Sequence, residues 1–185
     1  MQAKARIVIL NGVGSVGKSS IAQALQRIAG APYLHVEMDA FLDMLPQGYL
    51  DHPDGLTFTP LQQEGKPAIA IRSGPVAARV FRGMRHAIAA MAAQGNNLIV
   101  DDVMLDGEME EYTHLLAGHE LYRVGIFAPL DVIEARERAR GDRMIGLARW
   151  QYDRVHRDTS YDLEIPTADR TPMDCAQMIK ERFRL

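Results

Sequence analysis

The sequence has a single cysteine, little excess charge and no long apolar run. Cys175 cannot form an internal disulfide and lies in an apolar pattern typical of a packed helix face, which favours a reducing, cytoplasmic setting. The net charge of −3, without a Lys/Arg-rich run interleaved with aromatic residues, argues against a nucleic-acid partner. No apolar stretch is long enough to span a bilayer and no signal segment is recognisable, so we expect neither membrane insertion nor export.

Several kinds of catalytic pattern are also missing. The six histidines stand at no spacing typical of zinc ligands, and neither a nucleophile elbow nor a catalytic triad pattern is visible. There is no internal repeat and no low-complexity tract. At 185 residues the chain has the length of one domain with a real core, so we expect residues 1–185 to form a single domain that acts on a small molecule.

What the sequence does contain is a complete phosphate-loop pattern, G-x-x-x-x-G-K-[ST]. Its residues are Gly12, Val13, Gly14, Ser15, Val16, Gly17, Lys18 and Ser19. In this pattern the glycines let backbone N–H groups face phosphate oxygens, the lysine reaches the β and γ phosphates, and the serine hydroxyl binds Mg²⁺. An apolar run precedes the loop and helical spacing follows it, as the pattern requires. We therefore expect a bound nucleoside triphosphate, with ATP and Mg²⁺ as cofactors.

Short β-rich runs alternate with stretches of helical spacing, which predicts an α/β fold with a mostly parallel sheet. We expect strands over 7–11, 33–36, 98–101, 121–127 and 161–165. We expect helices over 18–29, 40–45, 75–94, 107–117, 131–140, 145–157 and 172–183. Residues 46–72 show no clear periodicity and are too many for an ordinary connection, so they are expected to form a lid or an excursion that faces the substrate.

Acidic residues follow two of the expected strands, at the sheet edge where open parallel sheets bind ligands. Asp39 is a candidate general base for an acceptor hydroxyl, although it could equally cap the helix that starts at Ala40. Asp101 and Asp102 end another strand; side chains alternate along a strand, so only one can face a metal ion, and we expect it to be Asp101. The apolar residues near these acids suggest an acceptor pocket formed by Phe41, Met44, Leu45 and Met104.

The densest positive charge lies between residues 136 and 143. Arg140 and Arg143 flank a break at Gly141, where a lid could place them over the transferring phosphoryl group and neutralise its charge. Arg136 and Arg138 fit a solvated helix face better.

Together these motifs resemble the chloramphenicol phosphotransferase family of small phosphate-loop kinases, almost from end to end. The matching stretches are 9–19, Asp39 with 44–46, 99–103, 139–143, and 155–156 with 161–164. The resemblance implies a three-layer P-loop kinase fold, with a five-stranded mostly parallel sheet and helices on both faces. It also implies O-phosphorylation of chloramphenicol by ATP, which inactivates the antibiotic. In that reading Asp39 is the base, residues 12–19 hold ATP, and Arg140 and Arg143 act at the phosphates.

The segment 46–72 has no clear counterpart in the family, so the nucleotide chemistry could persist while the acceptor changes. Two alternatives therefore remain open. One is a kinase for another small hydroxyl compound, such as a nucleoside, a sugar or a metabolite; a nucleoside monophosphate is disfavoured because its phosphate would want a cluster of arginines, and this region offers a single arginine, Arg72. The other is a non-catalytic ATP-binding regulator. The sequence does not fix the oligomeric state.

Overall fold

The protein is described by a computed structural model over residues 4–105, 107–141 and 144–185. Its centre is a five-stranded parallel sheet in the order β2-β5-β1-β6-β7. The strands are β1 (Arg6–Asn11), β2 (Tyr33–Glu37), β5 (Asn97–Asp102), β6 (Glu120–Phe127) and β7 (Leu163–Pro166). The predicted α/β class with a five-stranded parallel sheet is confirmed.

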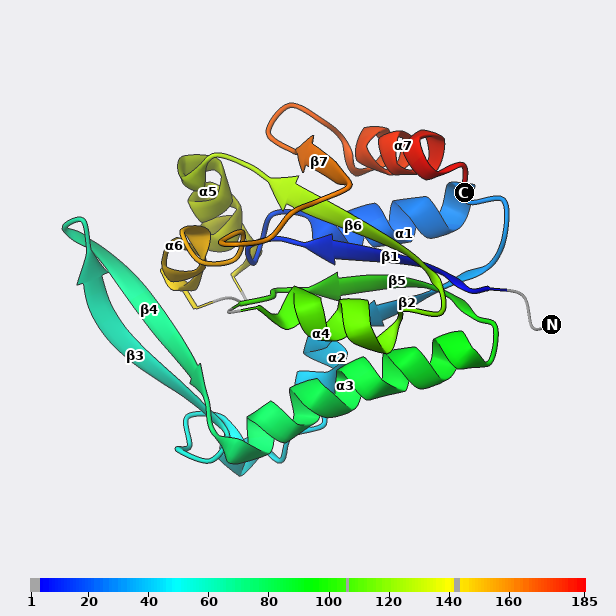
Figure 1. Ribbon diagram of the computed structural model, residues 1–185. Coiled ribbons are helices and arrows are strands. Elements are labelled where there is room, and N and C mark those ends of the chain that lie inside the picture. Colours follow the sequence, from blue (N-terminus) through cyan, green and yellow to red (C-terminus); the bar gives the residue numbers. More distant parts are fainter. Residues whose placement is uncertain (1–3, 106, 142–143) are drawn as a thin grey trace.

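Helices cover both faces of this sheet, so the molecule has three layers (Figure 1). On one face lie α1 (Lys18–Ile28) and α7 (Pro172–Phe183), and on the other lie α3 (Pro75–Ala93) and α4 (Glu108–Leu115). Three shorter or peripheral helices are α2 (Met38–Leu42), α5 (Leu130–Arg140) and α6 (Leu147–Tyr152). A 3₁₀ turn, η1, follows α2 at Gln47–Tyr49.

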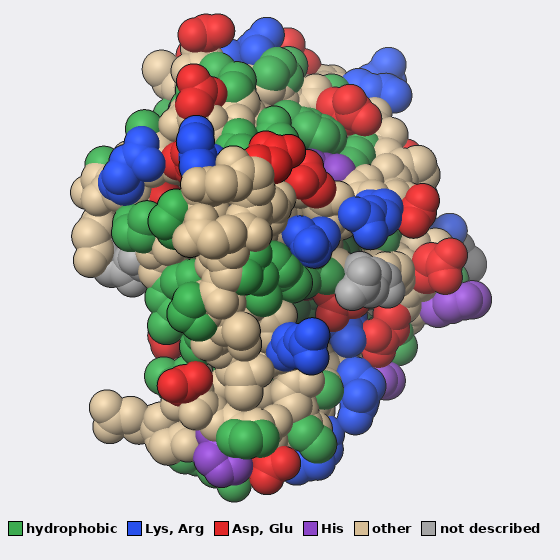
Figure 2. Space-filling view, turned by 90° about the vertical axis from the view of Figure 1, so that its left-hand side faces the viewer, with side chains coloured by type: hydrophobic (Ala, Val, Ile, Leu, Met, Phe, Trp, Pro, Cys, Tyr) green, Lys and Arg blue, Asp and Glu red, His purple; other side chains and the backbone are tan. Residues whose placement is uncertain are grey.

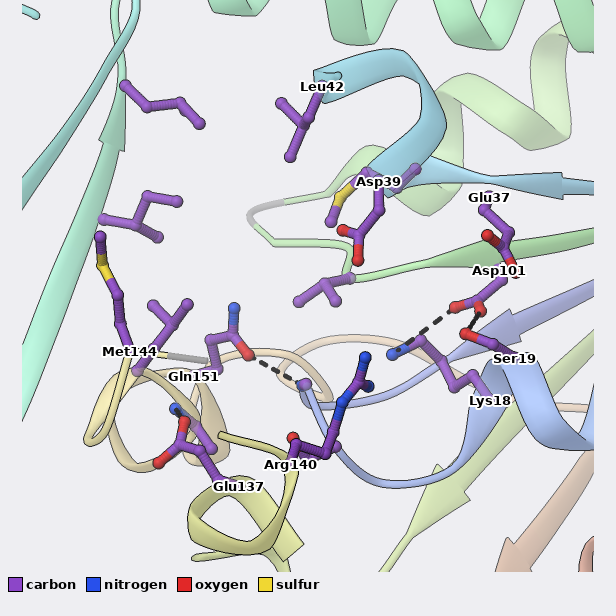
Figure 3. Close-up of a pocket in the computed structure, with 18 of the residues that line it drawn as sticks. Lys18, Ser19, Glu37, Asp39, Leu42, Asp101, Glu137, Arg140, Met144 and Gln151 are labelled. Carbon is purple, nitrogen blue, oxygen red and sulfur yellow. Dashed lines mark hydrogen bonds and ion pairs between the residues drawn. The ribbon is translucent and has the colours of Figure 1, made fainter. Parts of the chain in front are cut away.

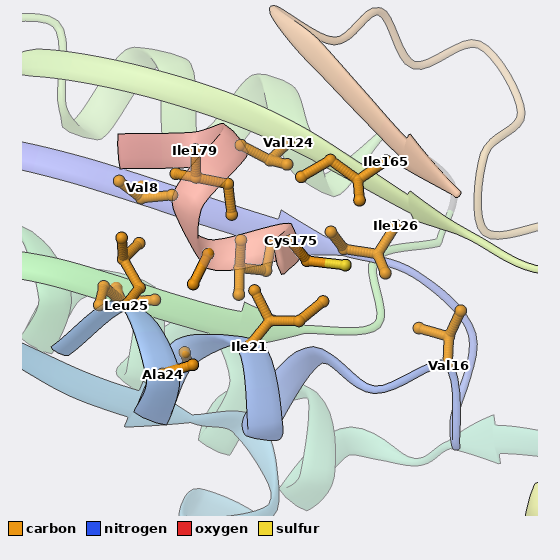
Figure 4. Close-up of a cluster of buried hydrophobic side chains, with 14 of the residues drawn as sticks. Val8, Val16, Ile21, Ala24, Leu25, Val124, Ile126, Ile165, Cys175 and Ile179 are labelled. Atoms are coloured by element: carbon orange, nitrogen blue, oxygen red, sulfur yellow. The ribbon is translucent and has the colours of Figure 1, made fainter. Parts of the chain in front are cut away.

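Because side chains alternate along a strand, β1 supplies both apolar layers. Val8 and Leu10 pack under α1 and α7, whereas Ile7 and Ile9 pack under α3 and α4. Figure 4 shows the first of these clusters, in which Cys175 of α7 lies buried among aliphatic side chains. The helix-face position predicted for this thiol is confirmed. The two buried layers hold β1 in the middle of the sheet, and with it the start of the phosphate loop.

The segment 46–72 contains regular structure that its sequence pattern did not predict. After η1 it forms an antiparallel hairpin of β3 (Leu56–Gln63) and β4 (Lys66–Ser73), which pairs with itself and not with the central sheet. Glu64 and Gly65 both have positive φ, 53° and 74°, and form the tight turn at its tip. The hairpin projects from one end of the molecule (Figure 1).

Other boundaries differ modestly from expectation. The helix expected over 145–157 is reduced to α6, and the helix expected from residue 40 begins at Met38. The strand expected from residue 161 begins at Leu163, while α7 has the expected bounds. None of the helices in the described part of the chain combines the length and the apolar character that a membrane span requires.

Candidate active site

The phosphate loop connects the end of β1 to α1, as its sequence pattern predicted. Ser15 and Gly17 adopt positive φ values of 65° and 108°, which curl the backbone ahead of the helix. A Cβ atom on Gly12 would lie 2.7 Å from the carbonyl oxygen of Ile126, so no side chain fits there. Lys18 is 6% exposed and donates to the carbonyl oxygens of Gly12 (2.8 Å) and Val13 (3.1 Å), across the concave side of the loop.

Asp101 is the carboxylate that faces this loop. The Ser19 hydroxyl donates to its Oδ2 at 2.5 Å, and Lys18 Nζ lies 3.7 Å from its Oδ1. Burial raises the pKa of Asp101, but the charge of Lys18, the nearby His35 and the hydrogen bond from Ser19 outweigh it, so the net pKa is lowered. This carboxyl group therefore carries a negative charge beside the loop at neutral pH.

Asp102 points to the opposite side of β5. It accepts hydrogen bonds from the Tyr112 hydroxyl and from the Val103 backbone N–H, both at 2.8 Å. Its burial, together with the nearby charge of Glu108, raises its pKa to about 7. Of the two acids only Asp101 lies next to Ser19, in agreement with the alternation argument.

Two further side chains approach Asp101 from β2, the neighbouring strand. His35 Nε2 lies 3.8 Å from Asp101 Oδ2, and His35 Nδ1 lies 3.3 Å from Glu37 Oε1. His35, Glu37 and Asp101 each place one ligand atom within 4.8 Å of the others. The spacing of these residues in the sequence did not reveal the cluster, because His35 and Glu37 approach Asp101 only when β2 pairs with β5 in the sheet.

A cavity of about 740 Å³ opens over the phosphate loop (Figure 3). Lys18 and Ser19 form its inner end, and Asp39 points into it from α2. Its outer walls are mainly apolar and come from α2, the hairpin region and α6. They include Leu42, Leu45, Leu50, Leu56, Phe58, Ile71, Met144 and Leu147.

The expected apolar pocket residues are only partly correct. Leu45 lines the cavity. Phe41 packs instead against the core beneath α3 and α4, and Met104 is buried in that core. Met44 is 67% exposed and does not line the cavity. The hairpin supplies Phe58 and Ile71 in their place.

The arginines of α5 fall into different environments. Arg140 lines the main cavity and also a second cavity of about 310 Å³ on the other side of the loop. Arg138 is exposed, as expected.

Arg136 does not lie on a solvated face: it donates to the Val16 carbonyl at 3.2 Å and to the Thr167 side chain and carbonyl at 3.0 and 2.8 Å. That expectation was wrong because the face of α5 that carries Arg136 packs against the loop. Arg143, the other expected lid arginine, lies outside the described residues.

Two buried polar residues were missed altogether. Glu137 accepts hydrogen bonds from the backbone N–H groups of Gly146 (2.8 Å) and Ala148 (2.9 Å), and thereby joins α5 to the start of α6. Gln151, on α6, accepts a hydrogen bond at Oε1 from the N–H of Gly14 at 2.9 Å. Both side chains line the main cavity.

A family profile described as "Chloramphenicol phosphotransferase-like protein" matches residues 5–184. The chain belongs to this family. It is 28% identical over 185 residues to a protein of Mycobacterium tuberculosis described as a "putative O-phosphotransferase", covering 97% of this chain and 82% of that one. The expected family is confirmed, and the chain is a phosphotransferase enzyme of the kinase type.

Solved structures with the same fold as this chain include two kinases. The APS kinase CysC of Mycobacterium tuberculosis, solved with AMPPNP and APS, has a TM-score of 0.69 at 18% identity and covers 98% of this chain and 99% of its own. Shikimate kinase of Bacteroides thetaiotaomicron has a TM-score of 0.62 at 16% identity, with coverages of 99% and 100%. At these identities the likeness establishes the P-loop kinase fold of the chloramphenicol phosphotransferase-like chain and nothing finer.

Proposed function

We propose that this enzyme transfers the γ-phosphoryl group of ATP to a hydroxyl group of a small, largely apolar molecule, with chloramphenicol as the leading acceptor. The observation that carries the proposal is the shared cavity: Asp39 points into the same space that the phosphate loop closes at its inner end. A carboxylate on one side and a phosphate cradle on the other are what transfer to a neutral hydroxyl requires.

The nucleotide is assigned to residues 12–19 and to the smaller cavity. This cavity borders Ser15, Val16 and Gly17 and continues between Arg136 and Arg170, away from Asp39. Its volume of about 310 Å³ is suited to a base and part of a ribose. Placing the base there leaves the terminal phosphate over Lys18, at the border with the main cavity.

The donor set beside the loop fits a hard divalent cation. Ser19 Oγ and Asp101 Oδ2 are oxygen atoms in direct contact, and the lowered pKa of Asp101 keeps its carboxylate charged. Ser19 and Asp101 would hold Mg²⁺, Asp101 directly or through water. When bound there, Mg²⁺ neutralises charge on the β and γ phosphates.

The chain's own residues then divide the transfer between them. Asp39 orients the acceptor hydroxyl and takes its proton as the new bond from the acceptor oxygen to phosphorus forms. The bond between the γ phosphorus and the bridging oxygen breaks, and ADP leaves with that oxygen. Lys18 and Arg140 would neutralise the charge that builds on the transferring group, and we propose the same role for Arg143 from the sequence alone.

The charges around the cavity favour a neutral acceptor. Among the described lining residues the cations, Lys18 and Arg140, lie on the nucleotide side, whereas Asp39 and Asp43 lie on the acceptor side. A phosphorylated acceptor would meet two carboxylates there.

Figure 2 looks onto the end of the molecule that carries the hairpin and shows hydrophobic side chains gathered beside the hairpin backbone, with charged side chains around them.

The direct test is to mix the purified protein with ATP, Mg²⁺ and chloramphenicol and to look for a mass gain of one phosphoryl group. We expect Asp39→Asn to keep its ATP affinity and to lose about 10²- to 10⁴-fold in kcat, the usual range for a general base. Lys18→Ala should impair both ATP binding and turnover. Asp131→Asn, an exposed acid on α5, serves as the control and should match wild type.

The outcomes separate the parts of the proposal. If Asp39→Asn is fully active, the assignment of the base is wrong. If chloramphenicol is not modified but a nucleoside, a sugar or another hydroxyl compound is, the chemistry stands and the acceptor is wrong. ATP consumption that no hydroxyl compound stimulates would instead indicate a nucleotide-dependent regulator.

A further inference from the structure

Gln151 is a buried polar side chain in the wall of the cavity, and the transfer described above gives it no role. It is 6% exposed and lies on α6, between the phosphate loop and the space into which Asp39 points. A buried amide has N–H donors and an acceptor oxygen that each need a partner. The direction in which the amide of Gln151 points therefore shows where its partners must lie.

The hydrogen bond from Gly14 fixes that orientation. A backbone N–H can only donate, so the atom 2.9 Å from it must be the amide oxygen of Gln151. The amide nitrogen then points the other way. Figure 3 shows it directed away from the loop and into the cavity. Within the part of the chain that the structure describes, this nitrogen has no hydrogen-bond partner.

The helix that carries Gln151 is held at its beginning and just past its end. Glu137 binds the N–H groups of Gly146 and Ala148 at its start, and the Val155 carbonyl, three residues past its end, accepts a hydrogen bond from the buried Asn11 at 2.8 Å. Arg149 of the same helix pairs with Glu134 of α5. The amide nitrogen is therefore presented to the cavity by a rigid support, which is the arrangement that makes a donor effective in catalysis.

We infer that Gln151 is a further catalytic residue, whose Nε2 donates hydrogen bonds to the oxygens of the γ-phosphoryl group as it passes from the nucleotide to the acceptor. This inference rests on the proposed phosphoryl transfer. The amide has no charge and exchanges no proton; it stabilises negative charge on the transferring group while its Oε1 stays on Gly14. Because Nε2 faces away from the loop, it can best donate to the γ-phosphoryl group once that group has begun to move toward Asp39.

Two substitutions separate this role from simple anchoring of the loop. Gln151→Glu keeps an oxygen that can accept from Gly14 but replaces the donor with an anionic oxygen. Gln151→Met keeps the approximate volume and removes both functions. A donor to the transition state predicts that kcat falls at least tenfold in the Met variant and further in the Glu variant, with the Met variant's KM for ATP and for the acceptor within about threefold. An anchor alone predicts that the Glu variant is close to wild type.

A second measurement needs no acceptor and so stays informative if none is phosphorylated. The affinity for ADP with aluminium fluoride, which imitates the transferring group, should fall at least tenfold in both variants, while the affinity for ADP alone changes less than threefold. Gln177→Glu, on the exposed side of α7, is the matched control, and thermal unfolding confirms that each variant is folded.

Three results would overturn the inference. One is a Glu variant with wild-type kcat. Another is equal aluminium fluoride affinity in wild type and both variants. The last is a loss confined to the acceptor KM, which would make Gln151 a part of the acceptor site.

Discussion

Replacing Gly146 by alanine should detach the hairpin from the body of the enzyme. Gly146 precedes α6 with a φ of 98°, and its carbonyl accepts a hydrogen bond at 3.0 Å from the N–H of Ile69 in β4. A Cβ atom at this position would lie 3.0 Å from Ala68 Cα and from the Pro67 carbonyl oxygen. Both neighbours are backbone atoms, so relief requires that the whole strand moves.

The size of the effect follows from two costs. An alanine at a left-handed φ costs roughly 1–2 kcal/mol, and crowding of packed backbone costs roughly 1–3 kcal/mol. The Ile69 hydrogen bond is worth only about 1 kcal/mol, so the hairpin should give way before the five-stranded sheet unfolds. Because Phe58 and Ile71 of the hairpin line the cavity, we expect the acceptor KM to rise about tenfold, equivalent to about 1.4 kcal/mol. The affinity for ATP should stay within about threefold.

The assay is steady-state kinetics with the acceptor and ATP varied in turn, combined with urea unfolding. Gly65→Ala is the control for backbone strain alone, because its φ is 74° and nothing lies within 4 Å of the added Cβ. Gly83→Ala, within α3 and also with open space around the Cβ, controls for the added methyl group and should be stabilising by about 0.5–1 kcal/mol. If Gly146→Ala raises the acceptor KM no more than Gly65→Ala does, the contact with β4 does not hold the cavity wall.

Four further substitutions have defined outcomes. Phe58→Ala and Ile71→Ala should each raise the acceptor KM by about an order of magnitude and leave the KM for ATP within a few-fold, as measured by the same kinetics; a change confined to ATP would assign the hairpin to the nucleotide. Burial raises the pKa of Asp162, but its hydrogen bonds with Arg123 outweigh this and lower it. Its contribution to stability is therefore full above the unfolded-state pKa and is lost as the pH falls through the folded-state value. In urea unfolding, the free energy of unfolding of Asp162→Asn should fall less than that of wild type between pH 7 and pH 3. Equal decreases in the two proteins would contradict this. Asn11→Ala removes three hydrogen bonds from a fully buried position and should cost roughly 2–4 kcal/mol in the free energy of unfolding, whereas a loss below 1 kcal/mol would show that the freed groups find other partners.

The parts of this enzyme that sequence reasoning predicted are those encoded locally. The phosphate loop is a contiguous pattern whose chemistry depends on its own backbone. Strand alternation predicted that only one of Asp101 and Asp102 faces the loop, and that one is Asp101; its role as a metal ligand stays a prediction. The five strands of the sheet were recognisable because each is a short run in which apolar residues are either continuous or alternate with polar ones. The role of Asp39 stays a prediction, although the structure places this residue in the shared cavity.

What the sequence did not reveal depends on contacts between distant segments. Arg136 looked like a surface residue because nothing nearby in the sequence shows that it reaches Val16, 120 positions away. Gln151 and Glu137 are polar residues inside or beside helical patterns, where solvent exposure is the ordinary expectation. The hairpin was missed because its strands are partly polar and contain Pro60, and such strands lack the alternation of a half-buried sheet.

The pairing of the hairpin also limits how the cavity can change by insertion or deletion. Phe58 pairs with Ile71 and Leu56 pairs with Ser73, so Leu56, Phe58 and Ile71 lie on the same face of the two strands, and these three line the cavity. Adding or removing one residue between Leu56 and Phe58 would turn part of the strand over, exchanging a residue that faces the cavity for one that faces away from it. Single substitutions, or length changes of two residues in each strand, keep the apolar face in place. Natural variants with altered acceptors should therefore differ here in side-chain identity or by even-numbered insertions, while the central sheet and the phosphate loop keep their length.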